Sequence, residues 1–132
     1  SCAERPPDFE DSLGNPYSFA GLENKWVVVN YWAVWCGPCI QEIAELNELH
    51  HERDDVVVFG VNFDGETGET LAKQVAKMRI RFPVFVGDPP ERFRFDYPQG
   101  LPTTHVVGPD GKLAQTLLGQ QSRKSLDAAT GR

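Results

Sequence analysis

Two stretches of the chain are apolar at nearly every position, namely 26–32 and 56–61. Runs of this kind, rich in valine and aromatic residues, are typical of strands that are covered on both faces of a sheet. The segment between them, 38–53, has the apolar spacing of an amphipathic helix. The pattern therefore predicts a strand, a helix and a parallel strand, joined in a right-handed βαβ unit.

The rest of the chain alternates between short extended and short helical patterns. Paired extended pieces at 9–20, around a turn at 13–16, predict a hairpin. Further elements are expected as a helix over 70–79, a strand over 82–86, a short helix ending at Phe93, a β-hairpin over 105–118 and a helix over 122–129. We interpret residues 9–132 as one domain and residues 1–8, with Pro6 and Pro7, as a tether or linker.

Charge and composition exclude some functions. The chain has 132 residues and a net charge of −6, and the basic residues of 77–81 and 92–94 are separated by apolar residues and Pro83. Nucleic acid is not expected as a partner, because phosphate binding needs a clustered basic face. No segment has the roughly 20 apolar residues of a membrane-spanning helix. Three cysteines are too few for a disulfide scaffold.

Two of these cysteines, Cys36 and Cys39, lie just after the first predicted strand and open the predicted helix. At a helix amino end, unpaired N–H groups and the helix dipole favour a thiolate over a thiol. Pro38 loses no hydrogen bond in a first turn, and Gly37 leaves room for a partner chain. Cys39 is one turn further on, so a disulfide is feasible. We expect Cys36 to attack a substrate disulfide and Cys39 to resolve the mixed disulfide, which requires Cys36 to be accessible.

Glu42 is the one acidic residue expected on the apolar face of this helix, one turn from Cys39. Partial burial would raise its pKa and let it accept a proton from Cys39. An acid at the edge of that face, reaching solvent, is the alternative. Asn30, a polar residue within the first strand, is interpreted either as part of the site or as a satisfied core amide. We interpret His50 and His51 as structural, with a positive charge that suits the helix end.

The string Trp35-Cys36-Gly37-Pro38-Cys39, after a strand and before a helix, resembles the thioredoxin superfamily. The segment 100–104, Gly-Leu-Pro-Thr-Thr, resembles the loop that carries a cis-proline facing the cysteine pair. The resemblance implies that Pro102 is cis and that the backbone of Leu101 pairs with substrate. It implies a thioredoxin-like α/β fold with a central mixed sheet flanked by helices. We expect the substrate to contact Trp35, Gly37, Pro38, Leu101 and Pro102.

Within the superfamily, the chain is similar to the TlpA/ResA-like thiol–disulfide oxidoreductases. Asn30, Glu42, the hairpin at 9–20 and a central insertion within 61–90 carry that similarity. The resemblance implies a reductase without a cofactor or bound metal, acting on oxidised proteins outside the cytoplasm, in a bacterial periplasm, with apocytochrome c as one implied substrate. It implies a monomer and a membrane thiol electron donor of the DsbD/CcdA type. Cys2 is either a lipid-bearing cysteine that tethers the protein to a membrane or an incidental free thiol.

Three other functions stay open at this point. Cys36, Cys39 and His105 could bind Cu(I), as in a metallochaperone. The pair could instead serve a disulfide oxidase or isomerase, or be inert in an interaction domain. Tight Cu(I) binding that is lost in His105→Ala would favour the metallochaperone, and insulin reduction would exclude the inert domain.

Overall fold

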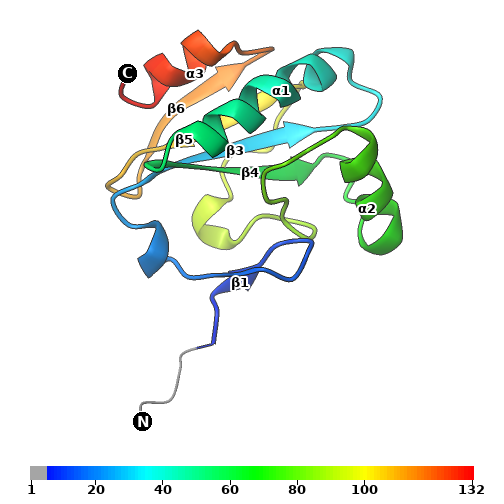
Figure 1. Ribbon diagram of the computed structural model, residues 1–132, viewed down its shortest axis with the longest axis horizontal. Helices are drawn as coiled ribbons and strands as arrows, with labels where there is room; N and C mark the ends of the chain where they lie inside the picture. The colour runs from blue at the N-terminus through cyan, green and yellow to red at the C-terminus, as the bar shows by residue number, and fades with distance from the viewer. Residues whose placement is uncertain (1–5) are drawn as a thin grey trace.

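A computed structural model describes residues 6–132, and its centre is a four-stranded mixed sheet (Figure 1). The strand order is β4-β3-β5-β6. The strands β3 (Trp26–Trp32) and β4 (Val56–Asn62) are parallel and are joined by helix α1 (Gly37–Glu52). The predicted βαβ unit is therefore confirmed. The strands β5 (Thr103–Val107) and β6 (Leu113–Leu118) complete the sheet as an antiparallel hairpin.

The remaining elements cover the two faces and edges of this sheet. They are β1 (Phe9–Glu10) and β2 (Pro16–Tyr17), the 3₁₀ turns η1 (Ala20–Leu22) and η2 (Glu91–Phe93), and the helices α2 (Gly68–Lys77) and α3 (Arg123–Ala129). Helix α3 begins with a capping box, in which Ser122 and Ser125 satisfy each other's backbone N–H groups. None of the helices in this part of the chain is long and apolar enough to cross a membrane.

Two hydrophobic clusters lie on opposite faces of the sheet, because alternate side chains of a strand point to opposite sides. Val28 and Trp32 of β3 pack with the apolar face of α1. Val27, Val29 and Tyr31 pack on the other face, with Phe59 and the hairpin and η2 residues. In Figure 1, α1 and α3 lie on one side of the sheet, and the β1–β2 hairpin and η2 lie on the other. The hairpin therefore closes the second face of the core.

The segment 82–86 differs from its prediction as a strand. It runs beside β4, where the backbone N–H of Gly60 donates to Pro83 O and that of Phe85 donates to Gly60 O. Only isolated bridges form there, Gly60 with Val84 and Asp11 with Phe85. Pro83 has no N–H to contribute to a ladder, so a regular strand cannot continue through it.

Candidate active site

Cys36 is the N-cap residue of α1, directly beyond the carboxyl end of β3. Its Sγ accepts a hydrogen bond from the backbone N–H of Cys39, at a donor–acceptor distance of 3.2 Å. Gly37 and Pro38 occupy the first helical positions, and no Asp or Glu lies in this turn. The sulfur of Cys36 therefore faces the positive end of the helix, as the sequence predicts.

Cys36 and Cys39 form a disulfide, with their Cα atoms 5.3 Å apart. Cys36 exposes 5% of its surface and Cys39 exposes 1%, so Cys39 is the inner residue of the pair as expected. Cys36 is therefore buried in this oxidised form, and the accessible Cys36 that the sequence analysis expects is not seen in it, because its sulfur is bonded to Cys39 and the residue packs in the α1-facing cluster. Gly37 and Pro38 beside it are exposed, and a Cβ added at Gly37 would meet no atom within 4 Å. These two residues therefore form exposed surface next to Cys36.

Glu42 is fully buried, with no exposed surface, on the same face of α1 as Cys39. Its carboxylate accepts hydrogen bonds from Asn30 Nδ2 at 2.6 Å and from the backbone N–H of Gln121 at 2.7 Å. Burial raises the pKa of Glu42 to about 7, although both hydrogen bonds lower that pKa. The alternative of an acid that reaches solvent is wrong, because α3 and the segment before it cover this part of α1.

Asn30 connects Glu42 to β5. Its Nδ2 also donates to Thr104 Oγ1 at 3.0 Å, and its Oδ1 has no hydrogen-bond partner among the described residues. Asn30 thus hydrogen-bonds to Glu42, and the alternative of a satisfied core amide is wrong, because its Oδ1 has no partner within residues 6–132. Sequence reasoning missed Thr104 and Gln121. The alternation of β5 could have placed Thr104 on the α1-facing side. Gln121 contributes only its backbone, which no side-chain pattern could reveal.

The peptide bond between Leu101 and Pro102 is cis, as the resemblance implies. Strand β5 is antiparallel to β3, with Thr103 opposite Tyr31, so β5 begins where β3 ends. Leu101 is half-buried and packs against the cluster that contains both cysteines. Leu101 and Pro102 therefore lie at the same end of the sheet as Cys36.

His105 lies on the other face of the sheet from the cysteine pair. Its ring contacts those of Tyr31 and Phe95, at centroid distances of 5.9 and 5.3 Å, and its nitrogens bond to Thr116 Oγ1 and the backbone oxygen of Asp96. Since Thr104 faces α1, its strand neighbour His105 must face away. The Cu(I) site of Cys36, Cys39 and His105 is therefore wrong. Residues 6–132 contain no other cluster of three His, Cys, Asp or Glu residues suited to a metal.

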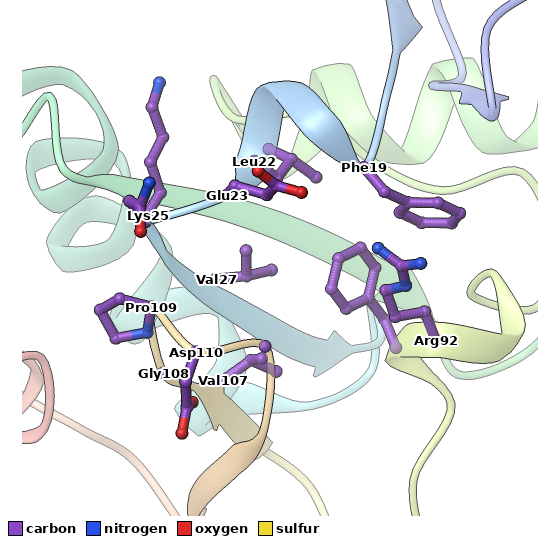
Figure 2. Close-up of a pocket in the computed structure, with 13 residues that line it drawn as sticks. Phe19, Leu22, Glu23, Lys25, Val27, Arg92, Val107, Gly108, Pro109 and Asp110 are labelled. Atoms are coloured by element: carbon purple, nitrogen blue, oxygen red, sulfur yellow. The ribbon is translucent and has the colours of Figure 1, made fainter.

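A separate pocket of about 320 Å³ lies at the opposite end of β3. Figure 2 shows Val27 and Val107 at its floor and Phe19 and Arg92 at one side. The guanidinium of Arg92 lies over the ring of Phe19, 3.9 Å from its centroid. No cysteine lines this pocket, so we do not assign it to the redox site.

The fold and the cysteine pair at the start of α1 define a protein of the thioredoxin-like class. The chain belongs to the AhpC/TSA family, whose model matches residues 3–116. This match and the relatives described next confirm the resemblance drawn from the sequence.

The chain is similar to curated relatives from bacilli. It is 29% identical to the thiol-disulfide oxidoreductase ResA of Bacillus cereus, over 89% of this chain and 68% of that protein. It is 28% identical to the thioredoxin-like protein YneN of Bacillus subtilis, over 94% of this chain and 75% of that protein.

Solved structures agree on the fold. StoA from Bacillus subtilis superposes with a TM-score of 0.73 at 18% identity, covering 92% of both chains. A DsbF homologue from Corynebacterium diphtheriae gives a TM-score of 0.70 at 28% identity, covering 92% of this chain and 80% of that one. The predicted thioredoxin-like fold, with its N-terminal hairpin, is confirmed.

Proposed function

We propose that this thiol–disulfide oxidoreductase reduces disulfide bonds of proteins outside the cytoplasm. The observation that carries the proposal is the placement of Cys36 at the amino end of α1, with Cys39 and the buried Glu42 behind it. In this arrangement Cys36 attacks the substrate disulfide and Cys39 resolves the mixed disulfide. Glu42 accepts the proton that Cys39 loses.

The reaction takes place in two exchange steps. In the reduced protein, the Cys36 thiolate attacks one sulfur of a substrate disulfide, and the other substrate sulfur leaves as a thiolate that takes up a proton. Cys39 then loses its proton and attacks Cys36 Sγ, which breaks the mixed disulfide and releases the second substrate thiol. The substrate gains two electrons, and the Cys36–Cys39 disulfide forms.

Glu42 accepts the proton of Cys39 in the second step. Its pKa of about 7 lies near neutral pH, where a general base is most effective. Asn30 and the backbone of Gln121 hold its carboxylate in place. Glu42 and Cys39 lie one helical turn apart on the buried face of α1, which supports this role.

The substrate chain is expected to lie between two groups of residues, Trp35, Gly37 and Pro38 on one side and the half-buried Leu101 and the buried Pro102 on the other. The first three are exposed, and a Cβ at the neighbouring Gly100 would meet no atom within 4 Å. This open surface can accept an extended segment that brings its cysteine to Cys36.

The dipeptide between the cysteines supports electron flow from this protein to the substrate, that is, reduction of the substrate disulfide. Gly37-Pro38 resembles that of thioredoxin, with a potential of about −270 mV, and not that of strong oxidants, with about −120 mV. A reductase needs electrons from a thiol donor, for which we propose a membrane protein of the DsbD/CcdA type. Oxidised apocytochrome c is a candidate substrate, in a bacterial periplasm. Equilibration of the Cys36–Cys39 pair with glutathione tests this direction, since a value near the oxidising end would indicate an oxidase or isomerase.

We also propose that the protein works as a monomer, and that a lipid on Cys2 tethers it through residues 1–8. Cys2 lies outside the described residues. Within the tether, Pro6 and Pro7 are exposed, and Asp8 joins the domain by accepting a hydrogen bond from the backbone N–H of Phe19 at 2.7 Å. Mass spectrometry of the protein expressed from its complete native gene in its native host would show the lipid as an added mass on Cys2.

A trapping experiment tests the order of the two cysteines. Reduced Cys39→Ser is mixed with a disulfide-bonded protein such as insulin, and mixed disulfides are detected on a non-reducing gel. We expect a stable adduct through Cys36, since the resolving thiol is missing, and no adduct with Cys36→Ser. An adduct that forms only through Cys39 would contradict the proposed roles.

A further inference from the structure

Three aromatic side chains from distant parts of the sequence meet beside the cysteine pair. Trp35 directly precedes Cys36, Phe63 follows β4, and Tyr97 lies in the segment before β5. The rings of Trp35 and Phe63 have centroids 6.0 Å apart, and those of Phe63 and Tyr97 are 5.4 Å apart. We call these three residues the aromatic surface.

The aromatic surface is open to solvent but held in place. Trp35 is 62% exposed and Tyr97 is 61% exposed. The Trp35 indole N–H donates to the carboxylate of Asp64, at 2.9 Å from the nearer oxygen, and Tyr97 OH donates to the backbone oxygen of Phe63 at 3.3 Å. Large aromatic side chains that are exposed and fixed together mark an interaction site rather than a core.

Carboxylates lie beside this surface, and one cation, Arg94, acts from nearby on Tyr31, whose ring contacts that of Tyr97. The segments 33–39, 60–66 and 95–104, which lie at this end of the sheet, contain no lysine or arginine. The exposed carboxylate of Asp64 accepts from the indole of Trp35, and Asp96, also exposed, is next to Tyr97 in the chain. A cation is attracted both by these carboxylates and by the faces of indole and phenol rings.

We propose that the aromatic surface and Asp64 bind a lysine or arginine side chain of the substrate, close in sequence to the cysteine that Cys36 attacks. This inference rests on the proposed function and adds a selectivity to it. The aromatic faces supply contact area, and the carboxylate supplies the countercharge, so a basic substrate segment is bound in preference to an acidic one. Trp35 is shared with the substrate-contacting residues proposed above, whereas Phe63, Asp64 and Tyr97 are added to them.

Matched disulfide-linked peptides test the inference. The peptides are identical except for lysine, glutamine or glutamate two residues from the cysteine. Their second-order rates of reduction by the pre-reduced full chain are measured at low and high salt. The variants are Tyr97→Leu and Asp64→Asn, and Asp110→Asn is the control, because Asp110 is an exposed acid in the β5–β6 turn at the other end of the sheet. The small neutral disulfide of 2-mercaptoethanol reports basal exchange.

We expect the lysine peptide to react roughly tenfold faster than the glutamate peptide at low salt, with the difference shrinking at about 1 M salt. Tyr97→Leu and Asp64→Asn should each lower that ratio about threefold to fivefold, while reduction of the neutral disulfide stays unchanged. Asp110→Asn should keep the wild-type ratio.

An equal rate for all peptides, or a ratio that both variants leave unchanged, would overturn this inference while leaving the reductase intact. A protein that reduces neither the peptides nor the neutral disulfide would overturn the proposed function, and the inference with it.

Discussion

Glu42 is a carboxylic acid in a fully buried position, held by Asn30 and the backbone of Gln121. Burial disfavours the charged carboxylate, and two donated hydrogen bonds only partly offset this cost, so its pKa rises from 4.5 to about 7. A group with this pKa exchanges its proton near neutral pH. Cys39 lies one turn away on the same buried face, and it is the donor that we propose for this proton.

Replacing Glu42 with glutamine should slow the resolving step. With the general base removed, we expect the release of substrate from the Cys36 mixed disulfide to be about a hundredfold slower at pH 8. In the wild-type protein the rate of this step should rise with an apparent pKa near 7, and that rise should be missing in the variant. Stopped-flow measurement of substrate release between pH 5 and 9 provides both readouts. The alkylation rate of Cys36 serves as the control, and an unchanged pH profile would contradict the role of Glu42.

The same residue should make stability depend on pH. Its folded pKa is raised, so the native state binds more protons than the unfolded state between pH 4.5 and about 7. The free energy of unfolding should therefore be highest below pH 4.5 as far as Glu42 contributes, and that contribution should be lost as pH rises through 7. The expected loss is about 3 kcal/mol. Urea unfolding of the wild type and Glu42→Gln at a series of pH values isolates the effect. The same dependence of the free energy of unfolding on pH in both proteins would contradict it.

At the scale of elements, Gly60 of β4 is closely packed between the side chains of Trp32 and Phe82. A Cβ at this position would lie 2.8 Å from Trp32 Nε1 and 2.9 Å from Phe82 Cε1. Both neighbours are large buried side chains that cannot move away freely. Gly60 thus allows β3, β4 and the segment 82–86 to approach closely, which shapes the core beneath α1.

We predict that Gly60→Ala lowers the free energy of unfolding by about 1–3 kcal/mol, because the added methyl overpacks this core. Gly37→Ala is the matched control, since its Cβ would meet no atom within 4 Å, and its effect should stay within about 0.5 kcal/mol. Urea denaturation of both variants checks the prediction. An equal free energy of unfolding for the two variants would contradict the prediction, because it would mean that the core at Gly60 relaxes around the added methyl.

The elements with strong local patterns could be predicted from the sequence, and contacts between distant segments could not. The βαβ unit follows from two apolar runs and one amphipathic segment.

His50 differs from its prediction, which is a positive charge at the end of α1. Its Nδ1 instead accepts from the backbone N–H of Val58, which leaves that nitrogen without a proton, and burial lowers the pKa of the ring. The partner of that nitrogen comes from β4, which no local pattern reveals.

The candidate site divides in the same way. Cys36, Cys39 and Glu42 share one short segment, and helical geometry alone brings them together. Thr104 and Gln121 join them only through tertiary packing. Residue types alone leave copper binding at His105 open, but the register of β5 turns that side chain to the other face.

At the scale of the whole molecule, function is concentrated at one end of the sheet. The ends of β3 and β4, the start of β5 and the start of α1 meet there, and with them the cysteine pair, the cis-proline and the aromatic surface. The pocket of Figure 2 lies at the other end, near the start of β3. The proposed function therefore depends on how well Cys36 can be reached from this end when the disulfide is reduced.

Alkylation of the reduced protein measures that property most directly. Protein treated with dithiothreitol and freed from it is exposed to iodoacetamide between pH 5 and 9, and each cysteine is followed by peptide mass spectrometry. We expect Cys36 to be modified first, at a rate that is already near its plateau at pH 7, while Cys39 stays protected. Slow modification of Cys36 at neutral pH, or earlier modification of Cys39, would contradict a helix-stabilised attacking thiolate at Cys36.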